Sequence, residues 1–81
     1  MRVTNIKGSG SNTRFMLDDG SYIKCEGEFS LSKFLIYRDS LRKFYYDSFY
    51  EMSNQQKTDF ENVLHRYRTE KLGSAFEIVF E

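Results

Sequence analysis

Residues 14–26 read RFMLDDGSYIKCE, and this stretch decides the fold. Apolar and polar side chains alternate before and after the central DDG at 18–20, which is the pattern of strands that bury one face. The Asp-Gly pair tolerates the positive φ of a tight reversal, so the stretch is predicted to form a β-hairpin. The predicted inward side chains are Phe15, Leu17, Ile23 and Cys25, and the predicted outward ones are Arg14, Lys24 and Glu26.

Strand patterns continue on both sides of this hairpin. Residues 2–7 are predicted to form a short opening strand, and the segments 33–38 and 41–46 are rich in Phe, Leu, Ile and Tyr, which favour strands. A turn-forming Asp-Ser pair at 39–40 separates the last two segments, so they are predicted to extend the hairpin into a meander. Residues 47–52 break the strand pattern.

A helix is predicted to begin after Ser53. Ser53 and Gln56 fit a capping box, in which each side chain accepts a hydrogen bond from the backbone amide of the other residue. An apolar stripe follows at helical spacing, and it consists of Phe60, Val63, Leu64 and Tyr67. Gly73 stands where a left-handed residue ends a helix, and residues 75–81 alternate again as a closing strand.

These elements predict an α+β fold class: a mostly antiparallel five- to six-stranded sheet with one C-terminal helix packed on a face, followed by a final strand. With 81 residues, the chain is predicted to be a single domain, 1–81. Six Tyr and eight Phe supply apolar area for the core of a chain whose one Cys allows no internal disulfide.

Charge and hydropathy argue against two classes of function, namely strong electrostatic binding of nucleic acid and insertion into a membrane. Lys plus Arg and Asp plus Glu both number 12, so the net charge is +0 and no global field attracts nucleic acid. No apolar run reaches the ~18 residues of a membrane span, and the first residues lack the apolar stretch of a signal peptide. A cytoplasmic protein without membrane contact is therefore expected.

Nucleophilic, acid–base and metal sites need matched groups that the sequence does not offer. His65 is the one histidine and flanks the apolar stripe, while Cys25 has the inward phase of a strand, where a buried and inert thiol is expected. Turn chemistry and solvation explain the carboxylates at 18–19 and the pair Glu26 and Glu28. The sequence thus predicts no enzyme, no bound metal and no cofactor.

Residues 44–50 read FYYDSFY, which is five aromatic rings in seven residues. One side of a strand cannot bury them all, so some are expected to stay exposed. Exposed Tyr supplies a large, rigid contact area with a hydroxyl group, which is favoured at protein interfaces. The competing interpretation is that Phe44, Phe49 and one Tyr cap the core between helix and sheet.

A nucleic-acid interface is the alternative function for this cluster. Platforms for single strands combine aromatic rings with interleaved cations, and Arg38, Arg42 and Lys43 lie just upstream of the rings. The nearer neighbours are Asp47 and Glu51, which repel phosphate. A protein partner is therefore favoured over nucleic acid, and a small nucleic-acid-binding or regulatory module remains the alternative.

Five features follow one another along nearly the whole chain. They are LDDG at 17–20, KCEGE at 24–28, the strand pair from 34 to 44, the helix opened by Ser53, and EIVFE at 77–81. This layout resembles small bacterial immunity proteins of polymorphic-toxin and contact-dependent growth-inhibition systems. Where that family carries a Trp and prolines before the helix, this chain has FYYDSFY and no proline.

The resemblance implies a cytoplasmic, non-enzymatic inhibitor that binds one cognate toxin domain, often a nuclease, and blocks its active site or its assembly. The residues predicted to contact the toxin are Tyr45, Tyr46, Asp47, Phe49, Tyr50, Glu51, Asp18, Asp19, Glu26 and Glu28. The rings are candidate anchors, and the carboxylates are candidates for mimicking phosphate in a basic nuclease cleft. The oligomeric state stays open, since an exposed edge strand would also pair two copies.

Overall fold

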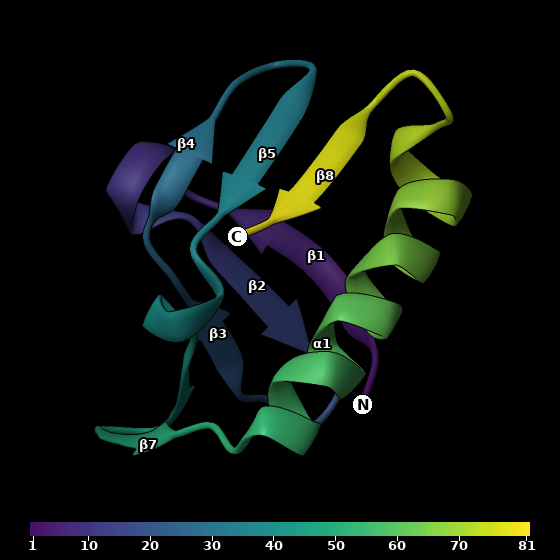
Figure 1. Ribbon diagram of the computed structural model, residues 1–81. Helices are drawn as coiled ribbons and strands as arrows, with labels where there is room; N and C mark the ends of the chain where they lie inside the picture. The colour runs from purple at the N-terminus through teal and green to yellow at the C-terminus, as the bar shows by residue number, and fades with distance from the viewer.

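The computed structural model describes residues 1–81, except for the side chain of Ser11 (Figure 1). Its strands are β1 (Val3–Lys7), β2 (Arg14–Leu17), β3 (Tyr22–Lys24), β4 (Gly27–Phe29), β5 (Lys33–Ile36), β6 (Arg42–Tyr45), β7 (Ser48–Glu51) and β8 (Glu77–Phe80). Its long helix is α1 (Asn54–Tyr67), and its short helical turns are η1 (Gly10–Asn12), η2 (Arg38–Ser40) and η3 (Arg68–Leu72).

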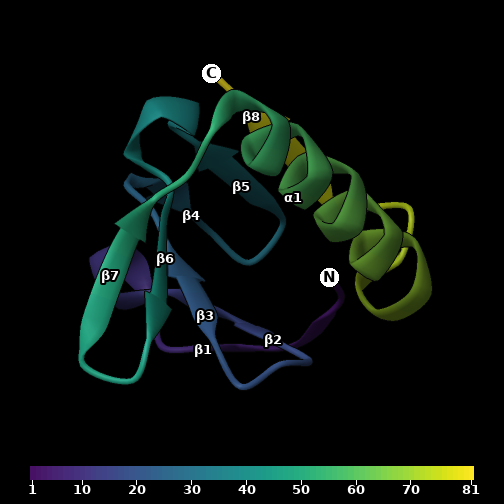
Figure 2. The ribbon, with the colours of Figure 1, turned by 90° about the horizontal axis from the view of Figure 1, so that it is seen from below.

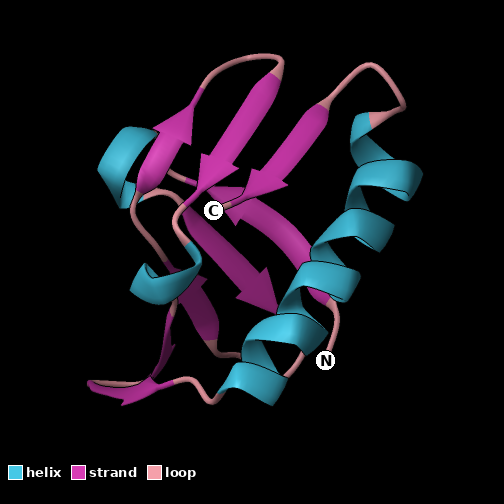
Figure 3. Cartoon of the chain, viewed as in Figure 1, coloured by secondary structure: helices cyan, strands magenta, loops and turns pink.

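The strands form two sheets, and the chain is an α+β protein as predicted. A five-stranded antiparallel sheet has the order β1-β2-β3-β6-β7, and a three-stranded sheet has the order β4-β5-β8. In the second sheet, β5 is antiparallel to β4 and parallel to the closing strand β8. Figures 1 and 2 show α1 along the side of the molecule where β8 and β1 lie, and Figure 3 sets the helices apart from the strands by colour. The C-terminal helix and the final strand are confirmed, whereas the second sheet was not predicted.

The β2–β3 hairpin has the predicted phase and turn. Phe15 pairs with Ile23 across the two strands, and the Leu17 amide donates to the Ser21 carbonyl at 2.9 Å. Gly20 has a φ of 86°, which is the left-handed value that the Asp-Gly pair led us to expect. The four predicted inward side chains are all buried: Phe15, Leu17, Ile23 and Cys25.

Phe15 lies at the centre of the core, with 0% of its surface exposed. The centroid of its ring is 6.4 Å from that of Phe29 in β4 and 6.0 Å from that of Phe34 in β5. The ring of Phe60 in α1 is 5.4 Å away. A single side chain of the five-stranded sheet therefore packs on two strands of the other sheet and on the helix, at separations where aromatic pairs add to the stabilisation from burial.

The predicted meander is wrong between β5 and β6. These strands do not pair, because β6 lies beside β3 in the five-stranded sheet while β5 lies between β4 and β8. The segment between them is the short helical turn η2 and not a hairpin turn, with the Ser40 amide donating to the Tyr37 carbonyl at 2.9 Å. The Ser40 hydroxyl accepts from the Glu26 amide at 2.7 Å. The Arg38 amide donates to the Glu81 carbonyl at 2.7 Å. These long-range bonds direct the chain from one sheet to the other.

The prediction that residues 47–52 break the strand pattern is also wrong. The strand β7 forms here and pairs with β6 through Phe44 and Phe49. Tyr46, in the turn between them, has a φ of 56°, which a non-glycine residue rarely adopts, so the sequence carried no signal for this reversal. The idea that Phe44 and Phe49 cap the core is corrected as well, since Phe49 is 57% exposed.

The helix begins as its capping box predicts. The Gln56 amide donates to the Ser53 hydroxyl at 3.2 Å, and the Ser53 amide donates to the Gln56 side-chain oxygen at 2.8 Å. Of the predicted stripe, three side chains are buried and the fourth is half-buried, in the order Phe60, Val63, Leu64 and Tyr67. After η3, Gly73 takes a φ of 87° and its amide donates to the Arg68 carbonyl at 2.8 Å, which confirms its predicted role at the helix end.

Candidate functional site

The β6–β7 hairpin carries the predicted aromatic cluster at one edge of the five-stranded sheet. All four residues of β7 are exposed. Figure 2 shows this hairpin extending away from the core and from the body of α1. The exposed fraction is 83% for Tyr46, 57% for Tyr50 and 40% for Tyr45. The prediction that part of the cluster remains exposed is therefore confirmed.

Alternation along the strands divides the rings between the two faces of the hairpin. Ile23 faces the core and pairs with Lys43, so Lys43 and its own partner Tyr50 lie on the core side of the sheet. Phe44 and its partner Phe49 lie on the opposite side, which we call the outer face. The hairpin therefore presents a different surface on each side.

On the core side, the hairpin borders a pocket of about 410 Å³, which we call the hairpin pocket. It lies between the β2–β3 turn, the β6–β7 hairpin and the start of α1. Its lining residues are Asp19, Lys43, Tyr45, Tyr50, Glu51, Met52 and Gln56. The fold thus gathers three of the predicted contact residues around one concave surface: Asp19, Tyr45 and Tyr50. Glu51 also borders the pocket, but its carboxylate pairs with Arg42 on the other side of the sheet.

Asp19 fixes a negative charge at the wall of the hairpin pocket. One of its carboxylate oxygens accepts hydrogen bonds from the Ser21 hydroxyl and, at 2.9 Å, from the Ser21 amide. Its other oxygen lies 3.3 Å from the Lys43 ammonium nitrogen. These donors, Ser21 first, lower the pKa of Asp19 from 3.8 to about 2. Asp19 therefore links the turn of the first hairpin to a strand of the second.

The other predicted contact residues lie on separate parts of the surface. Tyr46 and Asp47 form the tip of the hairpin, and Asp18 lies in the β2–β3 turn. Glu26 follows β3 at the end opposite that turn, and Glu28 is exposed on β4 in the other sheet. The rings and Asp19 thus share one region, whereas Glu26 and Glu28 lie away from it.

The outer face carries an aromatic row that the sequence did not predict. The rings of Tyr22 and Phe44 stack at 5.1 Å with an interplanar angle of 1°, and Phe49 continues the row at 5.7 Å from Phe44. The Arg14 guanidinium lies 5.5 Å from the centre of the Tyr22 ring, and the Lys24 ammonium lies 5.9 Å from the centre of the Phe44 ring. These are cation–π separations.

Basic side chains dominate this face. The strand pairings place Lys7 beside Arg14 and Lys24 beside Arg42, all on the outer face. Glu51 in β7 lies opposite Arg42 and adds a carboxylate to this face. Its carboxylate oxygen lies 3.4 Å from the Arg42 guanidinium nitrogen. Alternation in the sequence put Arg14 and Lys24 outward, but the pairing of β3 with β6 had no local signal, so the sequence did not predict the surface they share.

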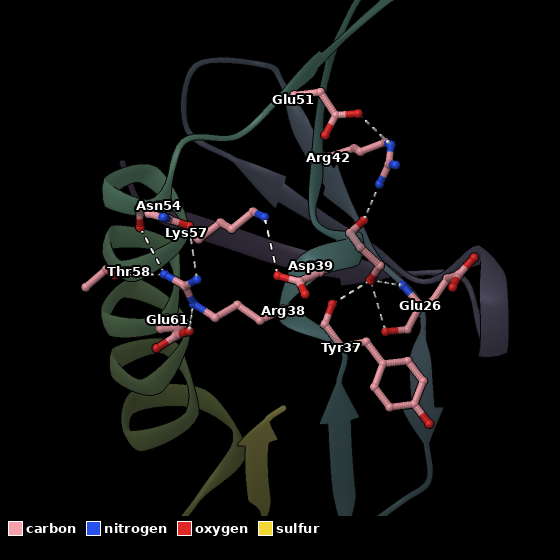
Figure 4. Close-up of polar contacts among 11 residues, drawn as sticks. Glu26, Tyr37, Arg38, Asp39, Arg42, Glu51, Asn54, Lys57, Thr58 and Glu61 are labelled. Carbon is pink, nitrogen blue, oxygen red and sulfur yellow. Dashed lines mark hydrogen bonds and ion pairs between the residues drawn. The ribbon is translucent and has the colours of Figure 1, made fainter.

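The three cations proposed for a nucleic-acid interface lie on three different surfaces. Arg42 is on the outer face, and Lys43 is on the core side, at the hairpin pocket. Arg38 turns toward α1, where its guanidinium lies 2.7 Å from the Glu61 carboxylate and donates to the Thr58 hydroxyl at 3.1 Å (Figure 4). The fold therefore does not combine these three residues into one basic patch.

Neither the cysteine nor the histidine lies in a reactive cluster. Cys25 is buried, as predicted, and burial raises the pKa of its thiol to about 12, which keeps the sulfur protonated. His65 is exposed on α1, with its ring 5.9 Å from that of Phe80. Within the described part of the chain, no group of three or more His, Cys, Asp and Glu side chains is arranged to hold a metal ion.

Comparisons with known proteins do not place this chain in a family. A scan against protein-family models, a search of curated proteins and a search of solved structures each gave no match. Among the residues that the structure describes, no helix combines the length and the apolar character needed to cross a membrane. The two sides of the β6–β7 hairpin are the surfaces from which a function is inferred.

Proposed function

We propose that this chain is an immunity protein that binds and neutralises a cognate bacterial toxin domain, with the β6–β7 hairpin as its main contact. The observation that carries the proposal is the exposure of Tyr45, Tyr46, Phe49 and Tyr50 on a hairpin at the sheet edge. Tyrosine is enriched among the few side chains that supply most of the binding energy at protein interfaces. The layout of the sequence along nearly the whole chain is consistent with the same function.

The surroundings of the hairpin suit tight binding. Phe44 packs between the rings of Tyr22 and Phe49, and the Arg42–Glu51 pair joins the two strands, so the hairpin is held before a partner arrives. A preformed contact surface loses less conformational entropy on binding than a flexible one. The hairpin pocket beside it offers a recess for a side chain of the partner.

Asp47 at the tip of the hairpin favours one mode of inhibition, which is blocking of the active site. It follows Tyr46 and is exposed, so the tip presents a ring and a carboxylate together. A tip of this composition suits the basic active-site cleft of a nuclease, where the carboxylate would take the position of a phosphate. We therefore propose a cytoplasmic inhibitor that blocks the active site of its toxin.

Co-expression tests the proposal directly. The toxin domain encoded immediately upstream is expressed in bacteria with and without this chain, and growth is measured together with co-purification. We expect rescue of growth, loss of rescue with Tyr46→Ala plus Tyr50→Ala, and an increase of about tenfold or more in Kd for each single variant. Leu31→Ala is the matched control, because Leu31 is a fully exposed apolar residue outside the hairpin, in the β4–β5 loop. Absence of rescue and of co-purification by the unaltered chain contradicts the proposal.

A further inference from the structure

The outer face arranges four cations in one line across the sheet. Lys7 lies opposite Arg14, Arg14 lies opposite Lys24, and Lys24 lies opposite Arg42. These residues come from β1, β2, β3 and β6, and we call them the cation row. Like charges that lie directly opposite one another on neighbouring strands destabilise a sheet. The chain therefore carries an arrangement on this face that its own stability does not favour.

We propose that the cation row binds the phosphate backbone of a single-stranded nucleic acid, with an unpaired base on the aromatic row. The inference goes beyond the proposed function, because it needs no toxin domain and uses the outer face of the sheet. It also differs from the nucleic-acid interface expected from the sequence, since Arg42 is the one residue that the two sets of cations share.

Three of the four cations have no carboxylate partner. Lys7, Arg14 and Lys24 form no ion pair within the described part of the chain. Arg42 differs, because Glu51 lies 3.4 Å from its guanidinium and neutralises that end of the row (Figure 4). The whole chain has a net charge of +0, so the excess of positive charge on this face is balanced on other surfaces. A polyanion therefore complements this face, although the molecule as a whole does not attract one.

The carboxylates that border the cation row lie at one end of it. Glu51 is next to Arg42, and Glu26 and Asp39 line a groove that also contains Lys24 and Arg42. At the opposite end, on β1 and β2, the two cations of the row are exposed. The phosphates are therefore expected over β1, β2 and β3, away from these carboxylates.

The aromatic row distinguishes nucleic acid from other polyanions. It runs beside the cation row, two residues away along each strand, which is a separation of about 7 Å. Phe49 ends the aromatic row, is 57% exposed and lies on the edge strand β7, so a base has room to stack on it. Each nucleotide carries a phosphate and a base, whereas an acidic peptide or a polyphosphate repeats its charge without the base. Paired bases of a duplex cannot stack in this way.

Contacts with the rings hold two of the cations in place. The Arg14 guanidinium lies 5.5 Å from the centre of the Tyr22 ring, and the Lys24 ammonium lies 5.9 Å from the centre of the Phe44 ring. These contacts leave the charges without a counterion. A cation that is already oriented loses less side-chain entropy when it binds a phosphate.

The test is fluorescence anisotropy of labelled oligothymidylate and oligouridylate decamers with the full chain, from ~50 mM salt upwards, where the two probes distinguish DNA from RNA. We expect a plot of log K against log salt to have a slope of about −2, because each of three phosphate contacts with a single strand contributes about −0.7. A glutamate decapeptide of similar charge should bind at least about tenfold more weakly, because it offers no base to the rings.

The triple variant Lys7→Gln/Arg14→Gln/Lys24→Gln should lower the affinity for the better-bound decamer by about tenfold or more and flatten the salt dependence. It should also resist urea at least as well as the unaltered chain, because it removes the repulsion within the row. If the triple variant fails to fold, Lys7→Gln/Lys24→Gln makes a smaller change and should weaken binding in the same direction.

Lys33→Gln/Arg66→Gln/Lys71→Gln is the matched control. It removes the same charge at three exposed positions, none of which lies in the five-stranded sheet, and it should leave most of the affinity. Phe49→Leu tests the rings separately. It should lower the affinity by about fivefold and leave the salt slope unchanged, because it removes a stacking surface and no charge.

Four results would overturn the inference: neither decamer binds at ~50 mM salt; the glutamate peptide binds as tightly as the decamers; a duplex of the same length binds more tightly; or the two triple variants weaken binding equally. The second result would make this face a site for acidic proteins. None of the four depends on the toxin, and the rescue experiment uses Tyr46 and Tyr50, which are not in either row. Failure of the inference is therefore distinct from failure of the proposed function.

Discussion

The two hairpins of the five-stranded sheet share their strand geometry and differ in what covers them. β2–β3 places Phe15 and Ile23 at 0% exposure, beneath the second sheet and the helix. β6–β7 leaves Phe49 and Tyr50 at 57% exposure on its two faces. Both hairpins contain aromatic residues, which favour strands. The difference shows that a high aromatic content does not by itself place a strand in the core. The position of the strand in the sheet decides what its rings contact.

The turns of the two hairpins differ in the same direction. In the first hairpin, the left-handed position is filled by Gly20, which has no Cβ and so adopts a positive φ without strain. In the second hairpin it is filled by Tyr46, whose Cβ makes this conformation unfavourable. An exposed edge strand with aromatic side chains is itself a risk, because it offers unpaired backbone groups to other chains. Such departures from the rules of stability are expected at functional sites, and they support the choice of the second hairpin as the binding surface.

The largest expected effect is the difference in stability between truncating a ring of the first hairpin and truncating a ring of the second. Phe15→Ala is expected to lower the free energy of unfolding by about 3–5 kcal/mol, because it leaves a cavity among the rings of Phe29, Phe34 and Phe60. Phe49→Ala is expected to lower it by about 1 kcal/mol or less, since that ring is mostly in solvent. Urea unfolding followed by circular dichroism measures both. Equal losses would remove the contrast between the hairpins.

The sequence predicted the parts of the fold that depend on neighbouring residues. The Asp-Gly turn, the Ser53–Gln56 capping box and the end of the helix at Gly73 each involve contacts over a few residues, and all three are confirmed. Long-range pairing had no such signal. The parallel bonds of β8 to β5, and the bonds of Ser40 to Glu26, form between residues that the sequence alone does not connect.

The candidate site was predictable to a similar extent. The crowding of rings in FYYDSFY predicted exposure, and Tyr45, Tyr46 and Tyr50 are exposed. The hairpin pocket also needs Met52 and Gln56, which reach it only because α1 starts beside the hairpin. The aromatic row and its cations depend on the pairing of β3 with β6, so they became visible only with the register of the sheet.

The turn glycine of the first hairpin has the second-largest expected effect. In Gly20→Ala, the alanine must adopt a φ of 86°, which is strained for a residue with a Cβ. The added Cβ meets no atom of the described residues within 4 Å, so the loss of stability comes from the backbone alone. We expect the free energy of unfolding to fall by about 1–2 kcal/mol. Thermal and urea unfolding measure the loss. An unchanged stability would show that the turn adjusts without cost.

The corresponding change in the second hairpin should have the opposite sign. Tyr46→Gly relieves a left-handed tyrosine with a φ of 56° and is expected to raise the free energy of unfolding by about 1 kcal/mol. It also removes an exposed ring, so binding of the toxin domain should weaken by about tenfold. Stability is measured by urea unfolding and affinity by calorimetry. A variant that gains stability and keeps its affinity would show that Tyr46 is not a contact residue.

The smallest expected effect is at Asp19, which links the two hairpins through Lys43. Its pKa falls from 3.8 to about 2 on folding, so its charge stabilises the folded state above pH 4, and this contribution is lost as the pH falls from 4 toward 2. The side chain is 51% exposed, which limits the effect to about 0.5 kcal/mol. Asp19→Asn should therefore be less stable than the unaltered chain by this amount at pH 6, and the difference should shrink toward zero as the pH falls to 2, as measured by urea unfolding at both values. The same difference at both pH values would mean that the ionised carboxylate does not strengthen the link, and that the two hairpins are held together by packing alone.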